Sequence, residues 1–207
     1  MAKFVPKKAF FENKVFIVFD GVYEPDEDTF LIAENLAVNA GEEVLDVGSG
    51  CGILSVLSAD KAKAVVAVDV NPDAVKCTKH NVMINEISER VEVVRGDLFE
   101  PLMIGALFDL VLFNAPYLPT ENEKSSGWID FAWSGGKKGR ELIDRFIAHA
   151  SKHLKPKGRI LLVQSTLSDV NETLKKFAKQ RFDASVLAEK KAEFETIALI
   201  LAKRRRA

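Results

Sequence analysis

Apolar residues recur along this chain in short runs, separated by longer stretches in which they have helical spacing. Short apolar runs bounded by glycine, proline or acidic residues predict buried strands, whereas spacings of three and four predict amphipathic helices. The predicted strands lie at about 15–19, 43–47, 64–69, 91–95, 108–113, 159–163, 184–189 and 196–201. The predicted helices lie at about 28–38, from 53, from 72, at 137–154 and at 168–180.

The order of these elements indicates the fold class. A helix comes first, strands and helices then alternate, and two strands follow one another at the end. Alternating strands and helices are typical of a parallel sheet that is covered by helices on both faces. We therefore predict an α/β fold with a doubly wound, seven-stranded, mostly parallel sheet and an antiparallel last strand. Residues 1–21 precede this pattern as an N-terminal extension.

The composition supports one domain over residues 1–207 and argues against several classes of protein. Hydrophobic residues make up 47% of the chain and the formal net charge is −1. This balance allows a sizeable core but lacks the basic excess of a broad nucleic-acid surface. The two cysteines, Cys51 and Cys77, suit a reducing compartment, and the histidines lack metal-ligand spacing. No signal peptide or run of transmembrane length is evident, so we expect a cytoplasmic protein with neither metal nor membrane contact.

The predicted strand 108–113 runs into Asn114-Ala115-Pro116-Tyr117. Proline ends a strand because it lacks the N–H group, so this segment should lie at the sheet edge where open α/β folds bind ligands. A planar amide or exocyclic amine is a poor nucleophile because its nitrogen lone pair is delocalised. The Asn114 side-chain oxygen and the Ala115 carbonyl can accept hydrogen bonds from such an NH2 group, while Pro116 stiffens the turn and Tyr117 offers a flat face. An ordinary exit from strand to loop is the alternative.

A glycine-rich turn follows the predicted strand 43–47. Its glycines are Gly48, Gly50 and Gly52, a spacing that differs from the Gly-x-Gly-x-x-Gly of dinucleotide-binding proteins. Glycine lets the backbone approach a ligand closely, but the carboxylate of Asp46 would repel a pyrophosphate. A sulfonium compound with an amino-acid tail fits better, because its ammonium group can pair with Asp46 directly or through water.

Asp69 ends the next predicted strand, roughly twenty residues after the glycines. A carboxylate at this spacing binds ribose hydroxyls in nucleotide-binding folds. The alternative is that Asp69 caps the helix that begins near Pro72, a role that Asn71 could fill instead.

These motifs, in this order and spacing, resemble those of the Rossmann-like class I S-adenosylmethionine (SAM) methyltransferases. The segment 114–117 resembles the Asn-Pro-Pro-Tyr signature of enzymes that methylate glutamine amides or adenine N6, with Ala115 in place of the first proline. The segments 23–25 (Tyr-Glu-Pro), 27–29 (Glu-Asp-Thr) and 133–136 (Trp-Ser-Gly-Gly) resemble one branch of the HemK family of release-factor glutamine methyltransferases. That branch is the short archaeal and eukaryotic form, which lacks the bacterial N-terminal helical domain.

The resemblance implies a cofactor, a substrate and a partner. It implies SAM as the methyl donor and the glutamine of the Gly-Gly-Gln motif in a class I peptide chain release factor as the acceptor. It also implies a small zinc-binding activator subunit in a heterodimer. Thr29 would lie by the cofactor, Asp97 would bind the adenine amino group and Leu98 would pack on the ring. The cofactor-binding residues are then Thr29, Asp46, Gly48, Gly50, Asp69, Asp97, Leu98 and Asn114, and the catalytic residues are Asn114, Ala115, Pro116 and Tyr117.

Two other functions stay open on the sequence. An N6-adenine methyltransferase acting on RNA or DNA would use the same strand exit for a flipped base, and the basic tail 203–206 is its one candidate contact. A non-catalytic SAM-binding subunit is suggested only by Ala115. The aromatic segment 115–136 is expected to face the substrate, and a locally packed surface loop is the alternative.

Overall fold

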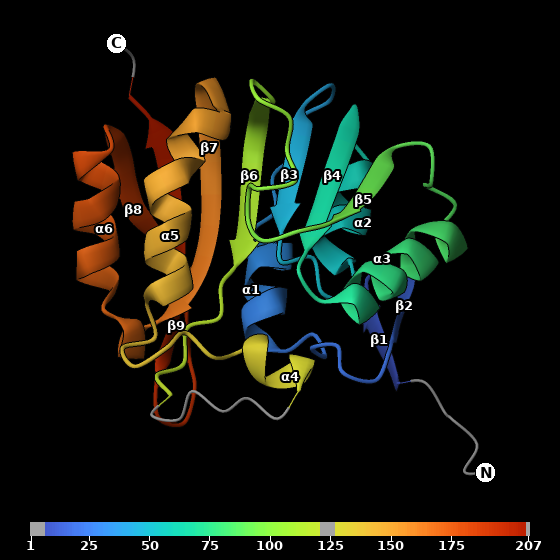
Figure 1. Cartoon of the computed structure of the whole chain (residues 1–207), viewed down its shortest axis with the longest axis horizontal. Coiled ribbons are helices and arrows are strands. Elements are labelled where there is room, and N and C mark those ends of the chain that lie inside the picture. The colour runs from blue at the N-terminus through green and yellow to red at the C-terminus, as the bar shows by residue number, and fades with distance from the viewer. Residues whose placement is uncertain (1–6, 121–126, 206–207) are drawn as a thin grey trace.

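The computed structural model describes residues 7–120 and 127–205 (Figure 1). The strands are β1 (Lys7–Phe11), β2 (Lys14–Val18), β3 (Glu43–Val47), β4 (Ala64–Asp69), β5 (Val91–Arg95), β6 (Phe108–Asn114), β7 (Leu154–Ser165), β8 (Phe182–Lys191) and β9 (Thr196–Arg204). The α-helices are α1 (Glu27–Glu34), α2 (Ile53–Ala59), α3 (Pro72–Ile84), α4 (Trp128–Phe131), α5 (Glu141–Ala150) and α6 (Val170–Lys179).

Strands β3 to β9 form a seven-stranded sheet in the order β5-β4-β3-β6-β7-β9-β8. Strand β9 is antiparallel to both β7 and β8, and the other neighbouring pairs are parallel. Helices α1, α2 and α3 pack along one face, and α5 and α6 cover the other (Figure 1). The predicted doubly wound sheet with an antiparallel last strand is confirmed.

The strand order reverses between β3 and β6, at the centre of the sheet. Strand β3 pairs with β4 on one side and with β6 on the other, and both pairs are parallel. Their central residues are fully buried, as expected where helices cover both faces. In open α/β sheets, ligands bind beyond the carboxyl ends of the strands at such a reversal. The fold therefore places a candidate site where β3, β4 and β6 end.

Two helices are shorter than the sequence predicts. Helix α5 begins at Glu141, because Gly136 and Gly139 adopt left-handed conformations, with φ of +77° and +67°, that a helix cannot include. Helix α1 ends at Glu34, short of the predicted residue 38. In the described part of the connection between β6 and α5, residues 115–120 and 127–140, α4 is a single short helix.

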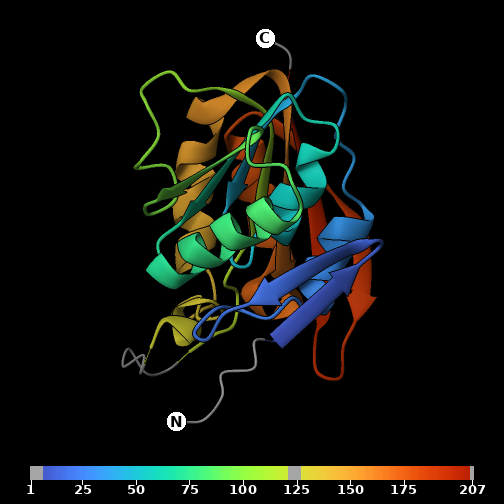
Figure 2. The ribbon, with the colours of Figure 1, turned by 90° about the vertical axis from the view of Figure 1, so that its right-hand side faces the viewer.

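The N-terminal extension forms a β-hairpin that lies beside α3 (Figure 2). Strand β2 agrees with the predicted strand, whereas β1 is not predicted, because of its five residues only Ala9 is buried. The Asn81 side chain of α3 accepts a hydrogen bond from the Ile17 N–H at 2.8 Å and donates to the carbonyls of Ile17 and Cys51 at 2.7 Å each. One buried amide thus joins the hairpin, α3 and the glycine-rich turn.

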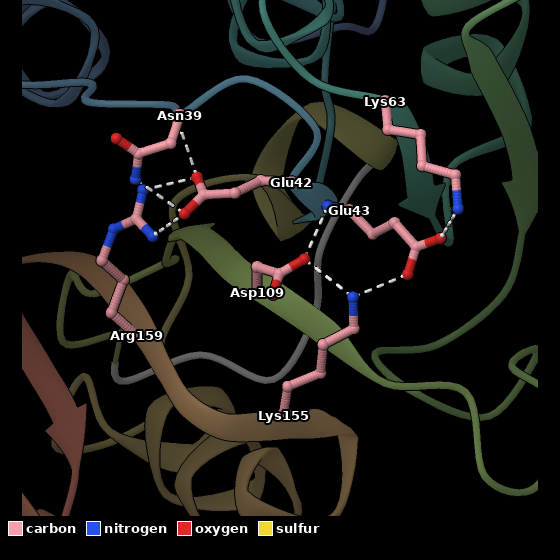
Figure 3. A network of polar contacts seen from close by, with 7 residues as sticks. All are labelled: Asn39, Glu42, Glu43, Lys63, Asp109, Lys155 and Arg159. Atoms are coloured by element: carbon pink, nitrogen blue, oxygen red, sulfur yellow. Dashed lines mark hydrogen bonds and ion pairs between the residues drawn. The ribbon is translucent and has the colours of Figure 1, made fainter.

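Polar side chains form a network at the opposite, amino-terminal end of the strands (Figure 3). The Arg159 guanidinium contacts both carboxylate oxygens of Glu42, at 2.7 and 2.8 Å. The Lys155 ammonium lies 2.8 Å from both Glu43 and Asp109. Burial opposes ionisation of Glu42, but the hydrogen bonds from Arg159 and Asn39, together with the Arg159 charge, outweigh it and hold its pKa at about 2. This end of the sheet is held by matched charges.

Three observations bear on nucleic-acid binding, membrane insertion and metal binding. Lys203 and Arg204, from the predicted basic tail, are part of β9, and the Arg204 guanidinium donates to the Leu154 carbonyl at 2.6 Å. Among residues 7–120 and 127–205, no helix has the length and apolar character needed to cross a membrane. Over the same residues, no group of three or more His, Cys, Asp or Glu side chains is arranged to hold a metal ion.

Candidate active site

The carboxyl ends of the central strands bring the predicted site residues together. Strand β3 leads into the glycine-rich turn, β4 ends at Asp69 and β6 ends at Asn114. The register places Asp46 of β3 beside Ala67 of β4 and Leu112 of β6. Helices α1 and α4 lie at this same end of the sheet (Figure 1). Segments far apart in the sequence thus converge on one edge.

The glycine-rich turn is held by backbone hydrogen bonds to β4. The N–H groups of Gly48 and Ser49 both donate to the Val68 carbonyl, at 2.8 and 3.1 Å. Gly48 and Gly50 have φ of +70° and +56°, where residues with a side chain are strained. A Cβ atom on Gly50 would meet no atom within 4 Å, so the space beside this residue is open. Glycine is required there by the left-handed backbone and not by crowding. The turn therefore presents a fixed backbone to a ligand.

Asp46 has one carboxylate oxygen without a partner. It is 1% exposed, its Oδ2 accepts a hydrogen bond from the Ser55 hydroxyl at 2.6 Å, and its Oδ1 has no hydrogen-bond partner among the described residues. Burial raises the pKa of Asp46 to about 6, and the nearby charge of Asp69 adds to this shift. A bound cation would satisfy Oδ1 and stabilise the charged carboxylate. An ammonium group is therefore a suitable ligand.

Asp69 lies between the glycine-rich turn and the start of α3. Its Oδ2 accepts the Gly50 N–H and its Oδ1 accepts the Asn71 N–H, both at 2.9 Å. Asn71 is the N-cap of α3 and accepts the Asp73 N–H at 2.9 Å, so Asp69 is not the helix cap. Burial raises the pKa of Asp69. Each carboxylate oxygen accepts more than one hydrogen bond, which leaves Asp69 able to bind ribose hydroxyls.

Asp97 and Leu98 follow β5, and both side chains are partly buried. Leu98 has a left-handed backbone with φ of +49°. The Asp97 carboxylate forms an ion pair with Arg145 of α5 at 2.7 Å, a contact that the sequence analysis does not predict. One Asp97 oxygen is therefore engaged, and the adenine contact stays a prediction.

Asn114 joins the end of β6 to helix α1. Its Nδ2 donates to the Thr29 hydroxyl at 3.1 Å, whereas its Oδ1 is buried and has no hydrogen-bond partner among the described residues. A buried, unpaired carbonyl oxygen is unfavourable unless a ligand donates to it. Asn114 thus presents an acceptor at the end of β6.

The three residues after Asn114 continue into the site. Ala115 is buried, and its N–H donates to the Val163 carbonyl of β7 at 3.3 Å. Pro116 is half-buried. Tyr117 is 8% exposed and its hydroxyl lies 3.5 Å from the Asp28 carboxylate. The catalytic assignments to these residues stay predictions, but the structure brings them within one turn of the Asn114 acceptor.

Sequence reasoning missed Asp28, because in the segment 27–29 it assigned a role to Thr29 alone. Asp26 is the N-cap of α1, whereas Asp28 is 5% exposed and turned inward. It contacts the hydroxyls of Tyr23 and Thr29 at 3.1 Å each. Burial raises the pKa of Asp28, while the hydrogen bonds it accepts act in the opposite direction. The sequence did offer a signal that Asp28 faces inward, since its spacing places it on the same helix face as Leu31 and Ile32.

The described parts of the segment 115–136, on either side of residues 121–126, contact each other near the strand exit. The Leu118 N–H donates to the Trp133 carbonyl and the Gly135 N–H donates to the Leu118 carbonyl, both at 2.9 Å. Trp133 is 40% exposed and Phe131 is 54% exposed, so aromatic surface remains available there. Residues 121–126 of this predicted segment lie outside the described residues.

Comparison with known proteins agrees with this geometry. Residues 16–198 match the Methyltransferase small domain family. The chain is 41% identical over 181 residues to a putative protein N5-glutamine methyltransferase of Methanocaldococcus jannaschii, which covers 86% of this chain and 90% of that one. It is 34% identical over 193 residues to the human methyltransferase HEMK2, covering 88% and 89% of the two chains.

A solved structure with a similar fold is that of the E. cuniculi Mtq2–Trm112 complex, which is responsible for the methylation of the translation termination factor eRF1. The TM-score is 0.71 at 25% sequence identity, and the match covers 89% of this chain and 99% of that one. The similarity therefore extends over nearly the whole of both chains.

Proposed function

The chain belongs to the Methyltransferase small domain family and, within it, to the HEMK2-like N5-glutamine methyltransferases, and on this premise we propose that it methylates a class I peptide chain release factor. The acceptor we propose is the side-chain amide of glutamine in the Gly-Gly-Gln motif. The action of the E. cuniculi complex on a termination factor supports this substrate.

The unpaired Oδ1 of Asn114 is the observation that carries the proposal. The NH2 group of a primary amide has two hydrogens to donate, and the Asn114 oxygen and the Ala115 carbonyl are two acceptors in adjacent positions. Accepting both hydrogen bonds fixes the direction of the amide nitrogen and draws electron density onto it. A lysine ammonium would first have to lose a proton, so the arrangement favours an amide.

SAM is the methyl donor that we propose, and the site residues fit it. The buried Oδ1 of Asp46 would accept the ammonium of the amino-acid tail, Asp69 would bind the ribose, and Asp97 and Leu98 would hold the adenine. When bound, SAM supplies an electrophilic methyl group on a positively charged sulfur. The task left to the chain is to exclude water and to orient the amide beside Asn114.

The segment 115–136 is proposed to contact the protein substrate. Its described parts carry the exposed aromatic side chains Phe131 and Trp133 next to the strand exit. Exposed aromatic residues are typical anchors for a bound peptide. We therefore predict that Trp133→Ala raises the KM for the release factor and leaves SAM affinity unchanged.

We also propose that a small zinc-binding subunit covers the edge of the sheet at β5. Strand β5 is an edge strand, and unpaired sheet edges are sites of strand addition. Exposed apolar side chains stand at the end of α3 and in the segment after β5, namely Met83, Ile84, Met103 and Ile104. The Mtq2–Trm112 complex supports such a partner. In the N-terminal hairpin, Ala9, Phe16 and Val18 are buried within this chain, whereas Phe10 and Val15 are exposed.

Label transfer tests the proposed activity. The purified protein, with and without a co-expressed small partner, is incubated with methyl-labelled SAM and a recombinant release factor. We expect label on the glutamine of Gly-Gly-Gln, located by mass spectrometry of the peptide. The matched control is a release factor in which that glutamine is replaced by asparagine, which has the same amide on a shorter side chain. Label on the control, or label removed by ribonuclease, would contradict the proposal.

A cytoplasmic location is part of the same proposal. Cys51 and Cys77 are both unpaired and buried, which suits a reducing compartment. Fractionation of cells with an antibody to the chain is the direct test, and recovery in a membrane pellet after a salt wash would contradict it.

A further inference from the structure

We infer that Asp28 is a positioning residue for methyl transfer: through the Thr29 hydroxyl it fixes the Asn114 amide so that its oxygen faces the acceptor. This inference rests on the proposed function, because it concerns the same site. It adds a residue to the machinery that neither the motif at the strand exit nor the glycine-rich turn contains.

The three side chains form a continuous chain of hydrogen bonds. The Thr29 hydroxyl lies 3.1 Å from Asp28 Oδ1, and Asn114 Nδ2 lies 3.1 Å from the Thr29 hydroxyl. Asp28 and Thr29 are 5% and 4% exposed, so bulk water does not compete for these bonds. The chain ends at Asn114 Oδ1, which has no partner among the described residues.

The negative charge on Asp28 determines the direction of these hydrogen bonds. An ionised carboxylate has no hydrogen to donate, so the Thr29 hydroxyl must donate to Asp28. The hydroxyl hydrogen is then engaged, and Thr29 can only accept from Asn114. Asn114 must therefore turn its NH2 group toward Thr29 and its oxygen toward the site. Without this constraint, the two ends of the amide would compete for the Thr29 hydroxyl.

Other donors hold Asp28 in place for this task. The Thr29 N–H donates to Oδ1 at 2.5 Å, the Tyr23 hydroxyl lies 3.1 Å from Oδ2, and the Tyr117 hydroxyl lies 3.5 Å from the same oxygen. In the described part of the chain, no lysine or arginine forms an ion pair with Asp28. The carboxylate thus depends on hydrogen bonds alone, and two of its donors are the hydroxyls of tyrosines.

Protonation of Asp28 would remove the directionality. A neutral carboxyl can donate to the Thr29 hydroxyl, which can then donate to Asn114 Oδ1 and occupy the acceptor. The titratable groups that face this cluster are the hydroxyls of Tyr23 and Tyr117, with Asp26 and Glu195 as the further acidic neighbours. Methyl transfer should therefore decline on the acid side as Asp28 takes up a proton.

Asp28→Asn tests the inference, because the amide keeps the size of the carboxyl but can donate to Thr29. At saturating SAM and release-factor substrate, we expect kcat to fall by roughly 10- to 100-fold, the scale expected when a reacting group is misplaced. The SAM dissociation constant, measured by calorimetry, should stay within about three-fold. The residual activity should also lack the acid limb of the wild-type kcat profile.

The matched control is Asp109→Asn, the same change at the opposite end of the sheet, where Asp109 accepts the Glu43 N–H and the Lys155 ammonium. It should keep kcat within about two-fold. Thr29→Val is a second test that keeps the shape and removes the hydroxyl, and it should reproduce the loss of kcat even if Asp28→Asn is poorly folded. Wild-type kcat and an unchanged acid limb in Asp28→Asn would overturn the inference. A wild-type enzyme inactive on the glutamine substrate would instead overturn the proposed function.

Discussion

The two ends of the central sheet hold their carboxylates in opposite ways. At the amino-terminal end, Glu42 and Glu43 contact arginine or lysine (Figure 3), and the pKa of each lies below its ordinary value. At the carboxyl end, Asp28, Asp46 and Asp69 are more deeply buried, form no ion pair among the described residues, and have raised pKa values. Carboxylates are thus paired with cations at the amino-terminal end of the sheet, whereas those at the carboxyl end have no cation beside them among the described residues.

The difference separates a structural end from a functional one. Matched ion pairs tie β7 to β6 and to the start of β3, and they need no further ligand. Buried carboxylates without cations lower the stability of the free protein, and such groups are retained where a ligand supplies the missing charge or hydrogen bonds. We therefore expect the SAM ammonium to bind at the unpaired oxygen of Asp46 and the acceptor amide to bind at that of Asn114.

Asn114→Ala should lower kcat more than any other change considered at the carboxyl end of the sheet. Removing the acceptor leaves the substrate amide without its partner, and we expect kcat to fall by about 100- to 1,000-fold, as for loss of one preorganised hydrogen-bonding group. SAM affinity, measured by calorimetry, should change by no more than a few-fold, because we assign the unpaired Asn114 oxygen to the acceptor amide. Equal losses of kcat and SAM affinity would show that Asn114 serves mainly the cofactor.

Asp46→Asn should separate ligand binding from stability. We expect SAM affinity to fall by roughly 10- to 100-fold, since a charge-assisted hydrogen bond to the ammonium is lost. The free variant should unfold at a higher temperature than wild type at pH 7.5, because no charge is buried there. Unchanged SAM affinity would place the ammonium elsewhere.

The pH dependence of stability follows from the same carboxyl. The pKa of Asp46 is about 6 in the folded protein and 3.8 ordinarily, so its stabilising contribution is complete below pH 3.8 and is lost as the pH rises through 6. At pH 7.5 the wild type should therefore be less stable than Asp46→Asn by roughly 1–3 kcal/mol. Thermal melts of both proteins at pH 5 and 7.5 check this, and an equal difference at the two pH values would contradict it.

Arg159→Met should weaken the structural end without affecting chemistry. The change leaves the Glu42 carboxylate, whose side chain is 14% exposed, without its cation. We expect a loss of about 1–3 kcal/mol, or roughly 2–10 °C in melting temperature for a chain of this size. The kcat measured well below the melting temperature should match wild type. A large fall in kcat would mean that the two ends are coupled.

Tyr23→Phe should have the smallest effect. Burial raises the Asp28 pKa, and the Tyr23 hydroxyl opposes this by donating to the carboxylate, so its removal should raise that pKa further. The acid limb of kcat should shift to higher pH, with little change at its plateau. An acid limb that stays in place would assign it to a group other than Asp28.

The sequence was sufficient to predict the sheet and to indicate which residues meet at its carboxyl end. Apolar periodicity predicted the strands from β3 to β9, and the residues at three strand ends indicated the chemistry because parallel strands bring their carboxyl ends together. Strand β1 was not predictable, since it is held by the Asn81 amide of α3 through its partner β2 rather than by its own pattern.

Long-range side-chain contacts account for what the sequence did not show. Asp28 lies in an acidic run at the start of α1, and only its contacts with Tyr117 and, through Thr29, with Asn114 carry the role that we infer for it. The ion pair between Asp97 and Arg145 likewise joins residues that no local pattern connects. Such contacts depend on how the helices pack on the sheet, which periodicity alone does not specify.

Mass spectrometry of the Gly-Gly-Gln peptide after reaction tests the central claim most directly. Wild type and Asn114→Ala are compared at equal, saturating occupancy by SAM, with the small partner subunit present. The account predicts one methyl group on the glutamine amide with wild type and almost none with Asn114→Ala. Methylation of the peptide at the wild-type rate by Asn114→Ala, or a methyl group on any other side chain, would contradict it.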